Sequence, residues 1–302
     1  MGPAPAAGLT VAAFATLLLV ALMMAANHVA ARLAFDNGVD VATAVAFRSG
    51  ITALVVGLIL LVYRVPVSLT RKHRRALLAI GMLVSVQSLC LYSAVARLPV
   101  ALALLAFNTY PLWTAFWARL LYRHRPERRV VLAMPVMLIG LALALDVFGA
   151  ASGLGMAAHW GQIGLGVFFA LVAGATFGLA LVWTQHEAGD LDGRLRTAST
   201  MAIVGVMALA GVASQGGFHF PQAAIGWVGL AALTFLYGTA FTVMFTVLPK
   251  LGVVGNTAIM NIEPIFALVL AWALLGQTIA AMQVAGGLLV VATVVFLGLR
   301  RA

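Results

Sequence analysis

The chain has 302 residues, of which 64% are hydrophobic and only 9% are charged, and its mean hydropathy is +1.09. A soluble domain carries about a quarter charged residues, so this composition excludes a water-facing globular protein. The net charge of +10 does not indicate nucleic-acid binding, because the basic residues lie in short loops beside apolar runs. The single cysteine, Cys90, excludes an intramolecular disulfide and a cysteine metal site.

Apolar runs recur along the whole chain, and each is long enough to cross about 30 Å of hydrocarbon as a helix. The runs do not alternate as the strands of a membrane barrel do. In chain order we predict ten spans near residues 9–33, 41–63, 76–96, 99–121, 130–147, 163–185, 197–215, 224–248, 252–275 and 279–299. The predicted fold class is an all-α integral membrane protein with ten transmembrane helices.

The distribution of basic residues predicts the orientation of these spans. With an even number of spans, the loops on the side of the termini hold most of the 18 basic residues: Arg64, Arg71, Lys72, Arg74, Arg75, Arg119, Arg123, Arg125, Arg128, Arg129, Arg194, Arg196, Lys250, Arg300 and Arg301. Only Arg32, Arg48 and Arg97 lie elsewhere. The positive-inside rule therefore predicts a multi-pass protein of the cell (inner) membrane with both termini cytoplasmic. A nine- or eleven-span arrangement would remove this asymmetry.

Two segments come into register when the sequence is shifted by 153 positions. Asn108-Thr109-Tyr110-Pro111 in the fourth span then falls on Asn261-Ile262-Glu263-Pro264 in the ninth. Five spans separate the copies, and an odd number inverts the second copy in the membrane. Inverted-repeat transporters are built in this way, with the substrate site near the midplane. We therefore predict a five-helix repeat over residues 1–150 and an inverted five-helix repeat over residues 151–302.

Pro111 and Pro264 are predicted to break their helices. Each proline lacks an N–H group and frees the carbonyl four residues earlier, on Phe107 and Met260. A freed carbonyl in lipid needs a polar partner, such as a side chain, a water or a substrate. A packing kink is the alternative for either proline alone. The pair, with an asparagine three residues before each, favours a cavity lined by the two breaks.

Two ionisable side chains within the predicted spans are candidates for a role in transport. Glu263 is the only carboxylate well inside a span, and we interpret it as a proton-coupling site or a partner for a substrate ammonium. The alternative is a structural hydrogen bond, with the carboxyl protonated or paired with Arg48 or a neighbouring amide. Arg48 lies about two turns into the second span, near the outer face, where it is expected to snorkel to the interface. The alternative for Arg48 is a charge pair that braces an outward gate.

Other polar and aromatic side chains within the spans are candidates to line the cavity. The set is Asn27, Gln87, Ser88, Tyr92, Asn108, Tyr110, Trp113, Tyr237 and Asn261, together with Glu263. Aromatic rings with a polar group suit a pocket for an amphipathic metabolite, and ordinary packing is the alternative. His28 points about 100° away from Asn27 on the helix, so both cannot face one point. We interpret His28 as a structural hydrogen-bonding residue.

The segments around both prolines resemble the ten-helix EamA-type members of the drug/metabolite transporter superfamily. Residues 94–121, AVARLPVALALLAFNTYPLWTAFWARLL, look like the fourth helix of that family, and residues 248–277, LPKLGVVGNTAIMNIEPIFALVLAWALLGQ, look like its counterpart. Ala26-Asn27-His28-Val29 resembles the polar break in the first helix, and Ala46-Phe47-Arg48 the arginine of the second. The resemblance covers almost the whole chain and implies export or exchange of small metabolites, often amino acids, through a central cavity.

The sequence departs from the family pattern at one place in each half. Members usually carry a glutamate after the glycine that ends the fourth and ninth helices, whereas this chain has Arg123-His124 and Gly276-Gln277. The departure leaves the expected fold unchanged but places the chain in no particular subgroup.

The predicted function is a secondary transporter that moves small polar or amphipathic metabolites by alternating access, with export favoured by the resemblance alone. The chain has no HEXXH, nucleophile-elbow or Walker motif, so we expect neither an enzyme nor an ATP-driven pump. The expected partners are a small-molecule substrate and the lipid bilayer, with no cofactor, metal or nucleic acid; protons as the coupling ion and a homodimer are left open. A non-transporting scaffold, a lipid-processing subunit and a passive channel are the alternatives.

Overall fold

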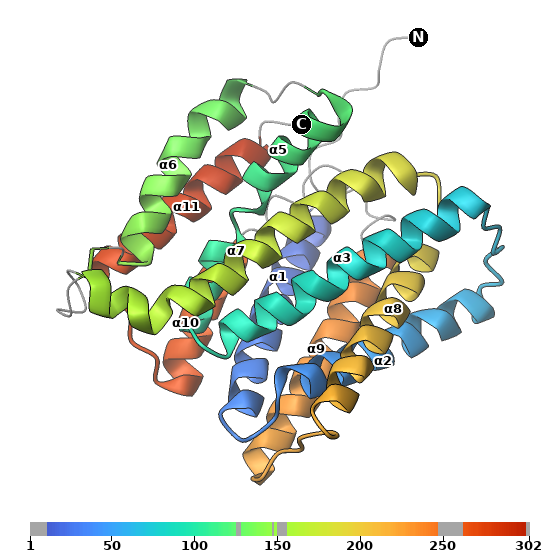
Figure 1. Cartoon of the computed structure of the whole chain (residues 1–302), viewed down its shortest axis with the longest axis horizontal. Helices are drawn as coiled ribbons and strands as arrows, with labels where there is room; N and C mark the ends of the chain where they lie inside the picture. Colours follow the sequence, from blue (N-terminus) through green and yellow to red (C-terminus); the bar gives the residue numbers. More distant parts are fainter. Residues whose placement is uncertain (1–10, 125–127, 147, 150–155, 247–261, 300–302) are drawn as a thin grey trace.

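The computed structural model describes residues 11–124, 128–146, 148–149, 156–246 and 262–299, and its regular structure there is helical (Figure 1). The helices are α1 (Val11–Phe35), α2 (Val41–Val62), α3 (Arg71–Val95), α4 (Val100–Phe107), α5 (Tyr110–Tyr122), α6 (Arg128–Ala144), α7 (Met156–Glu187), α8 (Gly193–Ser214), α9 (Ala224–Thr246), α10 (Glu263–Leu275) and α11 (Ala281–Leu299).

Seven of the described helical stretches, counting α4 and α5 as one, are long and apolar enough to cross a bilayer. Three further apolar helices are shorter, over residues 131–144, 263–275 and 281–293. Large apolar side chains such as Leu54, Leu61 and Phe235 are more than half exposed on the outer surface of the bundle. The chain is therefore a helical membrane protein, as predicted, and the number of ten spans remains a prediction.

The span predicted over residues 99–121 is apolar and long enough to cross a bilayer, and it is broken into two helices near Pro111, as the sequence predicted. α4 ends at Phe107, and α5 begins at Tyr110 with Pro111 in its first turn. A proline is tolerated in the first turn, where its missing N–H would have no intrahelical partner. The break therefore lies at the asparagine and threonine that precede the proline.

The same geometry recurs in α10, 153 residues later. α10 has 13 residues like α5, begins at Glu263 with Pro264 in its first turn, and ends at a left-handed residue. That residue is Gly276 with φ 63°, and its counterpart after α5 is Arg123 with φ 56°. The shift of 153 residues thus relates the start, the first-turn proline, the length and the end of α5 to those of α10.

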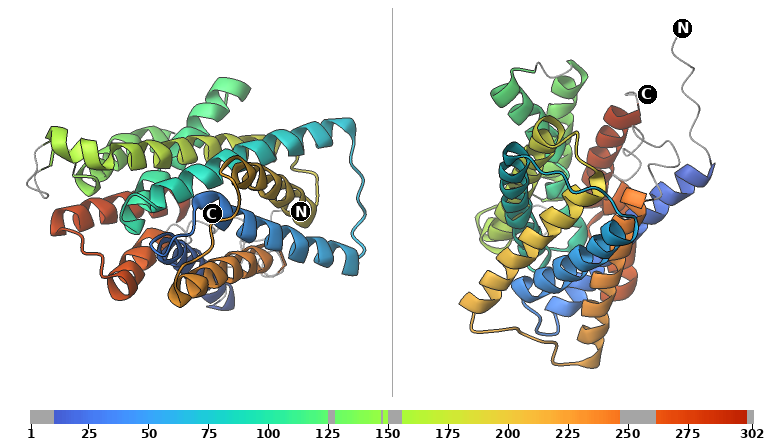
Figure 2. Two further views of the ribbon diagram at one scale, coloured as in Figure 1. Left: turned by 60° about the horizontal axis from the view of Figure 1, so that its bottom comes forward. Right: turned by 90° about the vertical axis from the view of Figure 1, so that its right-hand side faces the viewer.

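Helix packing follows the same correspondence. α3 packs against α7 as α1 packs against α9, and α5 packs against α7 as α10 packs against α1. The pairs α6–α11 and α2–α8 lie toward opposite edges of the bundle, and α1 passes between them (Figures 1 and 2). Each of these two pairs consists of a helix and its counterpart in the other half. Exchanging the two halves therefore maps each pair onto itself.

Glycines lie where the α2–α8 and α6–α11 pairs approach closely, and the residues that meet at these points show how the helices run. A Cβ at Gly205 of α8 would lie 3.6 Å from the backbone of Gly50, and a Cβ at Gly211 would lie 3.3 Å from Ala42. The later residue of α8 therefore meets the earlier residue of α2, so the two helices are antiparallel. Gly286 of α11 likewise approaches the backbone of α6 so closely that an added Cβ would clash with it.

Candidate functional site

Arg48 of α2 lies inside the bundle, with only 3% of its surface exposed. Its Nη2 donates a hydrogen bond of 2.8 Å to Ser88 Oγ on α3, and Ser88 donates in turn to Gln87 Oε1 at 3.3 Å. The guanidinium carbon lies 3.8 Å from the ring centre of Tyr237 and 4.6 Å from that of Tyr92. The expectation that Arg48 snorkels to the interface is therefore wrong.

Aromatic faces explain why the guanidinium stays inside. The faces of Tyr92 and Tyr237 attract a cation electrostatically and replace part of its lost hydration. Within the described part of the chain, no carboxylate lies at ion-pair distance from Arg48, so the expected charge pair is not formed there. The position of Arg48 within its span could be read from the sequence, whereas the aromatic side chains that α3 and α9 place around it could not.

Asn27 and His28 of α1 extend this group of polar residues. The Tyr92 hydroxyl donates a hydrogen bond of 2.9 Å to Asn27 Oδ1, and Asn27 is fully buried. His28 Nε2 lies 3.3 Å from Glu263 Oε1, and its side chain is 4% exposed. The two neighbours thus have different partners, as their separation on the helix predicted. His28, interpreted as structural from the sequence, is the contact between α1 and Glu263.

Glu263 is the first residue of α10, where the positive end of the helix dipole stabilises a carboxylate. Its side chain is 19% exposed, and its partner is His28 rather than Arg48. Tyr110, the first residue of α5, is the counterpart of Glu263 in the repeat.

We use the term polar cluster for the group formed by Asn27, His28, Arg48, Gln87, Ser88, Tyr92, Tyr237 and Glu263. It draws on α1, α2, α3, α9 and α10, and therefore on both repeats. Six of its members were predicted from the sequence as cavity residues: Asn27, Gln87, Ser88, Tyr92, Tyr237 and Glu263. The structure brings them together with Arg48 and adds His28.

The remaining candidate residues lie elsewhere. Asn108 is 7% exposed, and its Nδ2 donates to Leu104 O at 3.0 Å, so its side chain caps the end of α4. The Tyr110 ring is tilted against Phe107 and meets Phe177 edge to face, and Trp113 contacts Phe116 edge to face. Asn261 lies outside the described residues. A cavity role for these residues stays a prediction.

The α4–α5 break is packed against α7 rather than against a described pocket. A Cβ on Gly174 would lie 3.0 Å from the Phe107 carbonyl oxygen, and a Cβ on Gly178 would lie 2.8 Å from Thr114 N. A small pocket does lie between α4, α10 and α11, but apolar residues such as Leu105, Ile265 and Val291 line most of it. The freed carbonyl of Phe107 thus meets the glycine face of a neighbouring helix.

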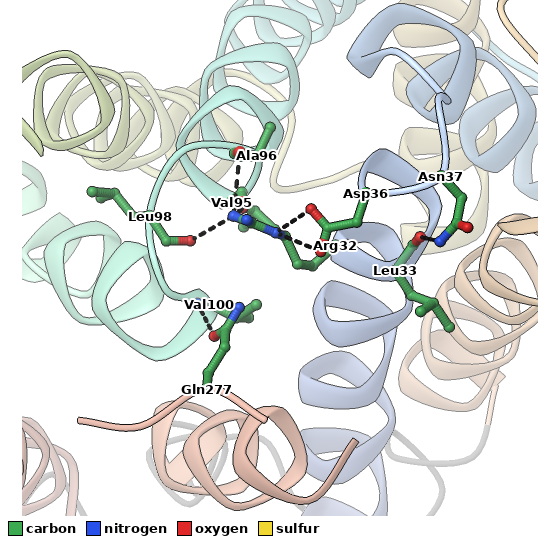
Figure 3. A network of polar contacts seen from close by, with 9 residues as sticks. All are labelled: Arg32, Leu33, Asp36, Asn37, Val95, Ala96, Leu98, Val100 and Gln277. Atoms are coloured by element: carbon green, nitrogen blue, oxygen red, sulfur yellow. Dashed lines mark hydrogen bonds and ion pairs between the residues drawn. The ribbon is translucent and has the colours of Figure 1, made fainter. Parts of the chain in front are cut away.

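A second polar network, not expected from the sequence, lies at the end of α1 (Figure 3). Arg32 Nε lies 2.9 and 3.0 Å from the two carboxylate oxygens of Asp36. Its Nη1 donates to the carbonyls of Val95, Ala96 and Leu98 at 3.1–3.3 Å, and so satisfies the exposed end of α3. The spacing of four residues between Arg32 and Asp36 is the signal in the sequence that indicates such a pair.

Gln277 ties the turn after α10 to the start of α4 in the same region (Figure 3). Its Oε1 accepts a hydrogen bond of 3.1 Å from Val100 N. α4 follows Pro99 and has no side-chain cap of its own, so Gln277 supplies the missing acceptor. At the position where the resembling family usually has glutamate, glutamine therefore keeps the oxygen that this contact requires.

Other contacts join loops that the sequence placed on one side of the membrane. Lys72 Nζ lies 3.1 Å from Glu187, and His73 Nε2 lies 3.0 Å from Asp190, on the side predicted to be cytoplasmic. His219 Nδ1 lies 2.7 Å from Asp40 on the opposite side. These pairs agree with the alternation of spans that the basic residues predicted.

An apolar helical bundle with a buried arginine and a histidine–glutamate pair between its helices defines a multi-pass membrane protein with a candidate functional site inside it. The model of the EamA-like transporter family matches residues 11–145 and again residues 164–299, so the chain belongs to that family. The two matched segments begin 153 residues apart, which is the shift that relates α5 to α10.

The fold also occurs in a solved protein structure. A crystal structure described only as that of a protein has a TM-score of 0.62 and 17% sequence identity, and the alignment covers 96% of this chain and 98% of the other. At this identity the likeness shows the fold alone. No curated protein matches the chain.

Proposed function

We propose that the protein is a secondary transporter that moves small polar or amphipathic metabolites by alternating access, with export as the favoured direction. The observation that carries this proposal is the polar cluster, buried within apolar helices where both repeats meet. A charged side chain near the centre of a bilayer costs about 2.5–3.5 kcal/mol on insertion scales and usually serves a function. A scaffold has no need of such a group.

The directions of the paired helices support an inverted repeat. α2 and α8 correspond to each other and are antiparallel. α6 and α11 also correspond to each other and pack at close range. A twofold axis in the membrane plane reverses each helix in this way, whereas an axis along the membrane normal would leave corresponding helices parallel. On this basis we assign ten spans in two halves, residues 1–150 and 151–302, with both termini cytoplasmic in the cell (inner) membrane.

Contacts at both ends of the bundle support alternating access. On the side predicted to be outside, Arg32 and Gln277 connect α1 and the turn after α10 to the α3–α4 turn. On the side predicted to be cytoplasmic, Lys72 connects α3 to Glu187 of α7. Release of one set of contacts at a time would open the polar cluster to one side of the membrane.

The His28–Glu263 pair is the favoured site for coupling to protons. A pair at 3.3 Å changes its net charge when one proton is lost, and α10 begins at that carboxylate. The proton would therefore act at the start of the helix that carries Pro264 in its first turn. Because the pairing with Arg48 is not formed, the alternative that Glu263 neutralises Arg48 loses its support.

The test is a counterflow screen with purified protein in proteoliposomes, using pooled amino acids and common drugs at two pH values. We expect saturable exchange of at least one compound, with a rate that changes with pH. Flux that rises with concentration without saturating would indicate a passive channel instead. No exchange by protein that is folded in the same vesicles would favour the scaffold. Protein-free vesicles are the control for leakage.

A further inference from the structure

Hydrogen-bond donors in the polar cluster have no acceptor among the described residues. Asn27 Nδ2 and Arg48 Nε are enclosed and have no hydrogen-bond partner in the described part of the chain, and the residues that carry them are 0% and 3% exposed. His28 Nδ1 is in the same condition and becomes a third donor when the ring is protonated. A buried donor left unsatisfied costs about 1–3 kcal/mol, and more when it is charged. Such groups are kept where something else completes them.

The charge of Arg48 is also unbalanced. The described contacts of its guanidinium are a serine hydroxyl and two tyrosine rings, all of them neutral groups. The one carboxylate among the defined members of the polar cluster, Glu263, already has His28 as its partner. An unpaired buried cation is strongly unfavourable, and an anion beside it removes most of that penalty. An anionic ligand with hydrogen-bond acceptors would therefore both balance the charge of Arg48 and satisfy the free donors.

We propose that the polar cluster binds the carboxylate of a monoanionic substrate through Arg48 and Asn27, an inference that rests on the proposed function and names its substrate class. A carboxylate is planar and has two acceptor oxygens, which match the N–H groups of a guanidinium and the amide of Asn27. One unpaired cation balances one negative charge, so a monocarboxylate fits better than a dianionic phosphate. The rings of Tyr92 and Tyr237 then contact the hydrocarbon part of the substrate.

The repeat provides this site once only. The positions that correspond to Asn27 and Arg48 in the second half are Ala180 and Met201, which have no donor to offer. Both are buried, at 3% and 2% exposure. One carboxylate therefore binds per chain, on the α1–α2–α3 side of the bundle.

Ligand-induced stabilisation of the full-length protein in detergent tests the inference directly. The probes are phenylacetate, hexanoate and lactate, with phenylacetamide, hexanamide and lactamide as neutral counterparts and with phenethylamine and inorganic phosphate as other charge types. We expect at least one carboxylate to raise the apparent Tm, with its amide binding about tenfold or more weakly. No stabilisation by any carboxylate, or equal stabilisation by acid and amide, overturns the inference, as does stabilisation by the amine or phosphate alone.

Three variants locate the site. Arg48→Met, which copies the residue of the second half, is expected to fold and to lose the preference for acid over amide. Asn27→Asp keeps the acceptor for the Tyr92 hydroxyl but adds an internal carboxylate, so it should raise the Tm of the ligand-free protein and abolish carboxylate binding. Arg97→Met removes an exposed arginine that contacts Ser93 O, and it should behave as wild type. Preserved discrimination in Arg48→Met, or an unchanged or lowered Tm in Asn27→Asp, contradicts the proposal.

Transport measurements separate this inference from the proposed function. If carboxylates bind as described but no compound is exchanged in proteoliposomes, the site stands and the transporter proposal fails. If a neutral or cationic compound is exchanged equally well by wild type and Arg48→Met, the transporter proposal stands and the carboxylate site fails.

Discussion

The two halves of the molecule share a framework but differ in what they place at corresponding positions. Asn27, Arg48 and Ser88 in the first half correspond to Ala180, Met201 and Phe241 in the second. Tyr237 lies between the two sets, because its ring contacts the Arg48 guanidinium while its hydroxyl lies 3.6 Å from the Met201 sulfur. At these three positions the first half has polar side chains and the second has apolar ones, while the second half contributes Tyr237 and Glu263 to the polar cluster.

This difference shows that fold and site are separable in a duplicated bundle. α5 and α10 share their length, a proline in the first turn and a left-handed residue at the end. α7 and α8, which correspond to α1 and α2, are helices with buried Ala180 and Met201 in place of Asn27 and Arg48, so the helical framework does not require these two polar residues. The buried arginine and the buried amide therefore call for an explanation from function, and exchanging residues between the halves is the direct way to examine it.

The largest effect is expected for Met201→Arg, which gives the second half the charge of the first. Met201 is 2% exposed and lies near Tyr237, which already contacts Arg48. A second buried guanidinium without a counter-charge should destabilise the protein by about 3 kcal/mol or more. The measurement is the apparent Tm and the yield of folded protein in detergent. Met201→Leu is the matched control and should change stability by less than about 1.5 kcal/mol; equal Tm values for the two variants would contradict the expectation.

A smaller effect is expected at the contact between α5 and α7. A Cβ at Gly178 would lie 2.8 Å from Thr114 N, so Gly178→Ala should cost about 1–3 kcal/mol through forced separation of the helices. The corresponding position in α1 is Ala25, which is fully buried, so that the α1–α10 contact already accommodates a methyl group. Ala25→Gly should therefore cost only about 1 kcal/mol. The apparent Tm of both variants in one detergent measures this difference in stability. A Gly178→Ala variant as stable as wild type would contradict the prediction.

Glu263→Gln tests whether proton coupling belongs to one half only. Glutamine keeps an acceptor for His28 but cannot exchange a proton, so transport should fall about tenfold and lose its dependence on pH. Tyr110→Phe, at the corresponding position of α5, should keep the pH profile of wild type. Initial rates of counterflow between pH 5 and pH 8 provide the measurement. A normal rate and pH profile in Glu263→Gln would remove the carboxylate from the coupling mechanism.

The smallest effect is expected at the N-terminus of α8. Asp192 accepts a hydrogen bond from Arg194 N at 2.8 Å and pairs with the Arg194 guanidinium at 2.9 Å. The side-chain hydrogen bond from Arg194 lowers the pKa of Asp192, so its contribution to stability is complete above its ordinary pKa and is lost as pH falls through the lower folded value. Asp192→Ala should cost about 1 kcal/mol at neutral pH.

The pH dependence distinguishes this cap from a general loss of packing. The difference in Tm between Asp192→Ala and wild type should shrink as the pH falls through the lowered pKa of Asp192, because the wild-type carboxylate then loses its charge. Asp40 caps α2 through Thr43 N at 2.7 Å, and Asp40→Ala is the matched variant in the first half. A difference for Asp192→Ala that stays constant down to acidic pH would contradict the role of the charge.

The sequence by itself determined the fold class, the approximate spans and the repeat. Apolar run length is set by bilayer thickness, and the proline in the first turn marks the start of α5 and of α10, so both features can be recognised without coordinates. The shift of 153 residues also follows from local sequence, since it relates two short segments that each have an asparagine three residues before a proline.

Tertiary structure decided which polar residues meet. Depth within a span predicted that Arg48 would reach the membrane surface, but Tyr92 and Tyr237 enclose its guanidinium, and these residues lie on helices far away in the chain. The pairing of His28 with Glu263 likewise depends on how α1 packs against α10. Periodicity states which way a side chain points along its own helix; which residue it meets depends on the close packing of several helices, and that packing is a property of the whole bundle.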